Sequence, residues 1–130
     1  MKSPQHEKSF LIITALGLLP IALSYGWQPD ASLPYLFNIQ AEDVNTRHIF
    51  RAMTGLYLAM IGLWLLGALR QRYREIALYS LIVFMLGLAF GRVVSFLVDG
   101  SPHWLLMAYA FWEIVLGCVG IYLVKQQDIP

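Results

Sequence analysis

Four long apolar runs alternate with short polar stretches along the chain. The runs cover about residues 9–26, 47–69, 76–98 and 103–124, close to or above the roughly 20 residues that an α-helix needs to cross a bilayer. A helix satisfies its backbone hydrogen bonds internally, as a membrane span must. The pattern therefore predicts an all-α fold, with one integral membrane domain over residues 1–130 built as an antiparallel four-helix transmembrane bundle.

The polar stretches predict how the spans are connected. Residues 27–46 mix acids with aromatics such as Trp27 and Tyr35, which suit a membrane–water interface. We therefore expect a structured loop with a short interfacial helix between the first two spans. Asn45 or Thr46 is of the type that caps a helix start, and one of them is expected to begin the second span.

Proline and glycine positions predict features of the helices themselves. Pro20 lies inside the first span, where a kink is the usual outcome. Gly87 and Gly91 are one turn apart, a spacing that lets two helix backbones approach closely in lipid. Gly117 and Gly120 form a similar face on the fourth span. These positions predict close packing of the third span against the fourth.

Composition narrows the class of protein. Only 13% of the residues are charged, about half of the roughly 25% found in soluble domains. No basic block with interleaved aromatics is present, so the expected partner is the lipid bilayer and not nucleic acid. Cys118 is the single cysteine and is expected to act as a small packing residue. His48 and His103 show no diagnostic ligand spacing, so no metal site and no cofactor are assigned.

The distribution of basic residues predicts the orientation. Lysine and arginine are enriched in cytoplasmic segments, and six such residues flank the spans on one side against two on the other. This bias predicts that both termini are cytoplasmic and that residues 27–46 face outward. The six are Lys2, Lys8, Arg70, Arg72, Arg74 and Lys125, and the two are Arg47 and Arg51.

Charged residues inside the spans mark a candidate polar site. Arg92 lies roughly 9 Å below the outer end of the third span, and Glu113 roughly 15 Å into the fourth. A charge at such depth needs a partner, so we expect an Arg92–Glu113 pair inside the bundle. Ser95 and Asp99 continue the stripe of Arg92, and Tyr109 is one turn above Glu113. An alternative stays open, in which the pair only orients the bundle.

Arg51 lies roughly 6 Å into the second span, near the level of Arg92. Two arginines with one deep glutamate leave a positive balance, which Asp99 is able to cancel. An uncompensated guanidinium is suited to a carboxylate or a phosphate, which it holds with two bonds. The alternative is that Arg51 only reaches to lipid headgroups.

The second span, from Arg51 through Tyr57 with Asn45 before it, resembles the second helix of small bacterial four-helix membrane proteins known only as a domain of unknown function. Residues 90–102 resemble the third helix of that family, and Glu113 matches its acidic residue in the fourth. The resemblance implies four spans and no established activity. We expect the protein to lie in the bacterial inner membrane. The candidate binding residues are Asn45, Arg51, Tyr57, Arg92, Ser95, Asp99, Tyr109 and Glu113.

These observations favour a non-enzymatic membrane protein, either a small accessory subunit or a binding module. Its outward polar pocket would hold a lipid headgroup or a small anion, or seat a partner in a larger membrane complex or homo-oligomer. The competing hypothesis is an enzyme or a proton-coupled transporter. In that case Glu113 handles protons, while Arg51 and Arg92 hold an anionic substrate.

Overall fold

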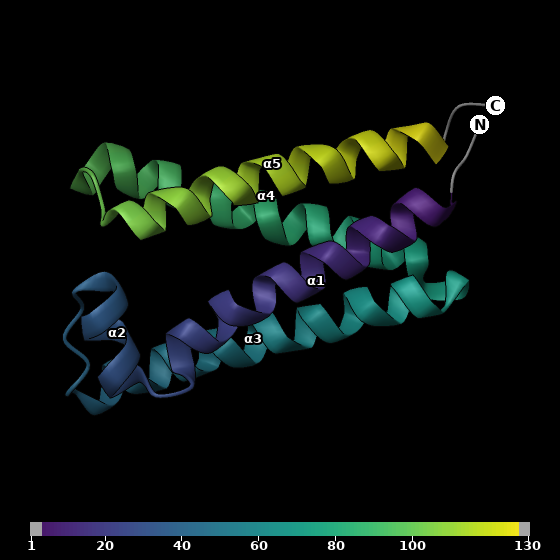
Figure 1. Ribbon diagram of the computed structural model, residues 1–130. Helices are drawn as coiled ribbons and strands as arrows, with labels where there is room; N and C mark the ends of the chain where they lie inside the picture. Colours follow the sequence, from purple (N-terminus) through teal and green to yellow (C-terminus); the bar gives the residue numbers. More distant parts are fainter. Residues whose placement is uncertain (1–3, 128–130) are drawn as a thin grey trace.

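The fold is known from a computed structural model that describes residues 4–127 (Figure 1). The described chain is helical and contains no strand, which confirms the predicted all-α class. The α-helices are α1 (Pro4–Gly26), α2 (Pro29–Phe37), α3 (Val44–Leu69), α4 (Arg74–Asp99) and α5 (Trp104–Gln127), and a 3-10 turn, η1 (Gln71–Tyr73), joins α3 to α4.

Four of the helices, α1, α3, α4 and α5, are long and apolar enough to cross a membrane. The chain is therefore a multi-pass membrane protein. The predicted spans coincide with these helices except at their ends, because polar residues extend several helices beyond the apolar run. The short helix α2 occupies the connection in which an interfacial helix was predicted.

The long helices run alternately in opposite directions, and both ends of the described chain lie at the same end of the bundle (Figure 1). Helix α1 packs along α3, and α4 packs along α5. The α4–α5 pair diverges from the α1–α3 pair toward the end where α2 lies (Figure 1). We call this the open end, and we call the opposite end, which holds the α3–α4 turn, the closed end.

A close backbone crossing joins α1 to α3 near the open end. A Cβ atom on Gly26 would lie 2.7 Å from the carbonyl oxygen of Phe50 and 2.9 Å from the Cα of Arg51, so no larger residue fits there. The buried hydroxyl of Thr54 donates a hydrogen bond to the carbonyl of Ala22 at 2.6 Å. Together these contacts fix which face of α3 is turned toward α1.

The contact between α4 and α5 uses only one of the two predicted glycine pairs. A Cβ atom on Gly117 or Gly120 would collide with a leucine or isoleucine side chain of α4. A Cβ atom on Gly87 or Gly91 would meet nothing within 4 Å. The prediction for Gly87 and Gly91 was wrong, because large α4 side chains fill the hollows left by the α5 glycines and thereby turn the glycine face of α4 away.

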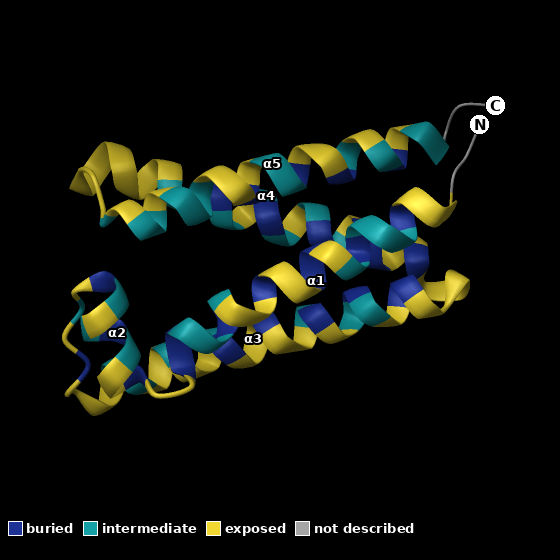
Figure 2. Cartoon of the chain, viewed as in Figure 1, coloured by how far each residue is buried: buried dark blue, intermediate teal, exposed yellow. Residues whose placement is uncertain are grey.

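Polar contacts tie the closed end together. The buried guanidinium of Arg74 donates to the carbonyls of Gly67 at 3.1 Å and Ala68 at 2.9 Å, groups that the last turn of a helix leaves unpaired. The amide of Gln127 donates to the carboxylate of Glu7 at 2.8 Å and so joins the ends of α5 and α1. In Figure 2 the buried residues of α4, apart from Ala89, lie in the half nearer this end.

Three smaller expectations are settled or left open. Asp43 caps α3 by accepting a hydrogen bond from the backbone N–H of Thr46, so the predicted cap at Asn45 or Thr46 was wrong by a few residues. Aspartate serves this position as well as asparagine does. Cys118 is exposed and does not pack as expected. Helix α1 is continuous through Pro20, and the kink stays a prediction.

The basic residues separate between the two ends. Lys8, the arginines of the α3–α4 turn and Lys125 belong to helix ends at the closed end, whereas Arg47 and Arg51 begin α3 at the open end. Lys2, which was also counted, lies outside the described residues. The separation agrees with the alternation of the helices, and the side of the membrane that each end faces stays a prediction.

Candidate functional site

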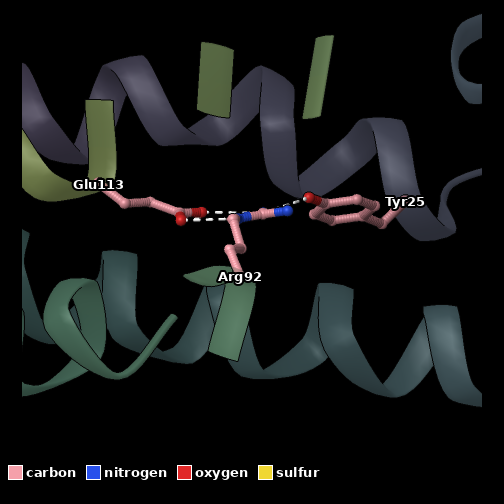
Figure 3. A network of polar contacts seen from close by, with 3 residues as sticks. All are labelled: Tyr25, Arg92 and Glu113. Atoms are coloured by element: carbon pink, nitrogen blue, oxygen red, sulfur yellow. Dashed lines mark hydrogen bonds and ion pairs between the residues drawn. The ribbon is translucent and has the colours of Figure 1, made fainter. Parts of the chain in front are cut away.

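A two-bonded ion pair links α4 to α5 within the bundle (Figure 3). The Nε atom of Arg92 donates to Oε2 of Glu113 at 2.7 Å, and Nη2 donates to Oε1 at 2.9 Å. Glu113 is 6% exposed, and the side chain of Arg92 is 23% exposed. The predicted contact between these two residues is therefore confirmed. Paired charge-assisted bonds of this kind are among the strongest in proteins.

A third helix joins the pair through Tyr25, near the end of α1. The Nη2 atom of Arg92 also donates to the Tyr25 hydroxyl at 3.1 Å (Figure 3). The network thus connects α1, α4 and α5. Sequence reasoning missed Tyr25, because a tyrosine near the end of a span is usually an interface anchor. No local pattern in the sequence marked it.

Aromatic rings hold Tyr25 in place. Its ring lies 5.6 Å from that of Phe37 on α2 and 5.9 Å from that of Phe50 on α3. Tyr57 and Tyr109, both predicted site residues, contact it edge-on at 5.6 and 6.2 Å. Such contacts leave an aromatic side chain little freedom. We therefore regard Tyr57 and Tyr109 as residues that position Tyr25 and not as members of the ion-pair network.

A cavity of about 530 Å³ adjoins the ion pair. It lies between the α1–α3 and α4–α5 pairs, on the side of the open end, and we call it the cleft. Only three of its lining residues, Tyr25, Arg92 and Ser95, have polar side chains. Its apolar walls include Phe50, Met53, Leu88, Phe96, Leu106 and Met107.

The two glycines that failed to pack against α5 line this cleft. Gly87 and Gly91 both belong to its wall, and no other atom occupies the space where their side chains would lie. Glycine in a helix interior costs about 1 kcal/mol relative to alanine. At these two positions the structure shows no helix contact that accounts for that cost. Because these two glycines have no side chains, the volume beside Arg92 stays open.

The remaining predicted residues lie away from the ion pair. Ser95 donates to the carboxylate of Asp99 at 2.7 Å, in an exposed contact nearer the end of α4. Arg51 is exposed and is directed to the carbonyl of Gly26, at 3.5 Å. It lines a separate surface hollow with its neighbours on α3, including His48. The structure therefore does not bring Arg51 to Arg92.

Asn45 is also exposed, in the first turn of α3, and none of the side-chain hydrogen bonds among the described residues involves it. The predicted set of site residues thus separates into the ion pair with its aromatic support, and a scatter of polar residues near the open end. The sequence predicted similar depths in the membrane for these residues. Which of them contact one another depends on the helix face that each one occupies.

Comparison with known families gives one assignment. A family model described as a domain of unknown function (DUF4345) matches residues 7–124. The chain belongs to the DUF4345 family. This confirms the resemblance found in the sequence. The match includes every residue of the ion-pair network and of the cleft wall. No curated protein and no solved structure matches the chain.

The chemistry available to this DUF4345 protein follows from which groups are already engaged. Both carboxylate oxygens of Glu113 accept bonds from Arg92, so Glu113 is held as the counter-charge of the guanidinium. Of the two hydroxyl groups on the cleft wall, that of Ser95 donates to Asp99 and that of Tyr25 accepts from Arg92.

Proposed function

We propose that this protein is a non-enzymatic binding module of the membrane that takes up an amphipathic, lipid-like molecule in the cleft. One observation carries the proposal: an apolar cavity of about 530 Å³ has its polar groups gathered at Arg92 and Tyr25. Small-molecule sites typically measure about 300–1,000 Å³ and combine apolar walls with a few convergent polar groups. The cleft matches that description in both size and composition.

The surface around the cleft supports entry from the bilayer. The half of α4 nearer the open end exposes large apolar residues such as Phe90, Val93 and Leu97. In a membrane these side chains contact lipid tails, so a molecule with a long apolar tail reaches the cleft without crossing water. Gly87 and Gly91 have no side chains that would obstruct entry on this side of the cleft.

The placement of the ion pair also favours binding over a purely structural role. A pair that only orients helices is best enclosed, because exposure weakens it. Here Arg92 forms part of the wall of a cavity, and aromatic rings from α2 and α3 hold its partner Tyr25. In the proposed orientation, supported by the basic residues at the closed end, the cleft opens toward the outer face of the bacterial inner membrane.

The test uses two photoreactive probes that share a hexadecyl chain carrying a diazirine, one with a methyl ester head and one with a sulfonate head. Each is mixed into nanodiscs with the purified protein, and cross-linked peptides are mapped by mass spectrometry. We expect labelling of cleft residues such as Met53 and Met107 by at least one probe. Labelling spread evenly over all lipid-facing residues would refute the proposal.

A matched pair of variants sharpens this test. Gly91→Leu fills the cleft, while Gly62→Leu makes the same change on α3, where a Cβ atom also meets nothing within 4 Å and no cleft wall is near. We expect Gly91→Leu to abolish cleft labelling and Gly62→Leu to preserve it, with similar melting temperatures for both. An accessory role in a larger membrane complex, or a homo-oligomer, stays a prediction.

A further inference from the structure

Arg92, on the wall of the cleft, keeps hydrogen-bond donors that no group among the described residues accepts. Arginine has five N–H donors, of which Arg92 commits three: Nε to Glu113, and the two of Nη2 to Glu113 and Tyr25. Its Nη1 has no acceptor among the described residues. The Tyr25 hydroxyl accepts one of these bonds from Arg92. Ser95 donates its hydroxyl hydrogen to Asp99, and its oxygen keeps its capacity to accept.

The base of the cleft carries no net positive charge. Arg92 is the one charged residue among those that line the cleft, and the carboxylate of Glu113 lies 2.7 Å from it. Asp99, bonded to Ser95 on the wall, adds a negative charge nearer the mouth. Arg51 lines a different hollow and does not offset this balance. The anion site expected from two arginines and one glutamate is therefore not what the side chains form.

We infer that the cleft selects a ligand whose head is uncharged and accepts hydrogen bonds, such as an ester, ketone or amide carbonyl. The inference rests on the proposed function and names its ligand class. An anionic head would lose its hydration without meeting an unpaired positive charge. A head with only N–H donors offers no acceptor to the Nη1 donors of Arg92. A plain hydrocarbon would leave those donors unpaired, whereas a carbonyl oxygen satisfies them.

The test is a competition among molecules with the same chain. Methyl hexadecanoate, hexadecyl sulfonate and hexadecane are each added, at equal mole fraction in the nanodisc, against whichever photoreactive probe labels the cleft. We expect the ester to compete about tenfold better than either of the others, the ratio expected for one hydrogen bond to a charged donor. Sulfonate competing equally or better would overturn the inference, and so would hexadecane matching the ester.

The outcomes distinguish an error in the ligand class from a failure of the proposed function itself. If neither probe labels the cleft of the wild-type protein, the binding proposal itself falls. If a probe labels the cleft and the ester has no advantage, binding stands and only the ligand class is wrong. Tyr25→Phe keeps the ring and frees the Nη2 hydrogen of Arg92 that the hydroxyl accepts, so the preference for ester over hexadecane is expected to persist. Loss of that preference in Tyr25→Phe, with the ratio unchanged in the matched control Tyr79→Phe on α4 away from the cleft, would contradict the assignment of Arg92 as the donor.

Discussion

Replacing Glu113 with glutamine is the most direct perturbation of the ion pair. In the native protein both carboxylate oxygens accept from Arg92, at 2.7 and 2.9 Å, and Glu113 is 6% exposed. Glutamine keeps the size of the side chain but removes its charge. It also replaces one acceptor by an N–H group that faces a donor of Arg92. The guanidinium is then left inside the bundle without a counter-charge.

The size of the effect follows from burial. Breaking a buried ion pair by removing one partner costs about 3–5 kcal/mol. The side chain of Arg92 is 23% exposed, which reduces the cost of desolvating its charge. We therefore expect Glu113→Gln to lower the free energy of unfolding by about 3 kcal/mol, near the lower limit of that range. Arg92→Gln strands the more deeply buried carboxylate and also removes the bond to Tyr25. Its expected cost is therefore closer to about 5 kcal/mol.

The assay is equilibrium unfolding in mixed detergent micelles for the wild type, both single variants and the double variant. Because the double variant strands neither charge, it should lose at least about 2 kcal/mol less than the sum of the single losses. Glu75→Gln, the same change at an exposed position in the first turn of α4, is the control and should shift stability by no more than about 0.5 kcal/mol. Additive losses for Arg92 and Glu113 would refute the coupling inferred from the structure.

Three further predictions follow from the packing and the topology. Gly117→Leu should destabilise the protein by about 1–3 kcal/mol through overpacking against α4. Gly87→Leu should leave the melting temperature unchanged, because its side chain meets no other helix. Equal effects of the two changes would contradict the observed rotation of α4 about its axis. Tyr57→Phe should be neutral or stabilising in thermal unfolding, because the buried Tyr57 hydroxyl has no hydrogen-bond partner, and a loss above about 1 kcal/mol would reveal one. In a cysteine-free background, an impermeant thiol reagent should label a cysteine at Asn38 from outside and spare one at Arg72; the reverse pattern would invert the proposed orientation.

The span limits and the ion pair were accessible from the sequence for a simple physical reason. Apolar runs of bilayer length have few structural solutions, so α3 and α4 were predictable almost to their ends. Charges deep in such runs are rare and must be compensated, which made Arg92 and Glu113 conspicuous and their pairing the least costly arrangement. Both inferences depend on how far each residue lies along its span, and this can be counted directly in the sequence.

The cleft was not accessible, because it depends on how each helix is rotated about its own axis. Gly87 and Gly91 looked like a packing face, yet the hollows at Gly117 and Gly120 took up the α4 side chains and set a different rotation. Either glycine pair satisfies the rule that small residues permit close approach. Only the complete set of side-chain volumes decides between them.

The same limit explains the error over Arg51. Its depth matched that of Arg92, but α3 turns Thr54 toward α1, where its hydroxyl bonds to the carbonyl of Ala22. That contact, with the close approach at Gly26, leaves Arg51 on the surface. Tyr25 was missed for the complementary reason, because its role comes from Arg92 reaching across the bundle and not from any local motif.

In the proposed orientation, Arg74 would act at two separate stages of biogenesis. While the chain is being inserted, before its helices have assembled, all three arginines of the α3–α4 turn are free to retain that turn in the cytoplasm, as the proposed orientation requires. Once the hairpin closes, Arg74 withdraws from water and binds the carbonyls of Gly67 and Ala68. Lysine at this position would preserve the first role but not the second, because an ammonium lacks the planar fork of donors. The resulting protein would be inserted in the correct direction, but the turn between its second and third spans would lack the paired hydrogen bonds that Arg74 donates to α3.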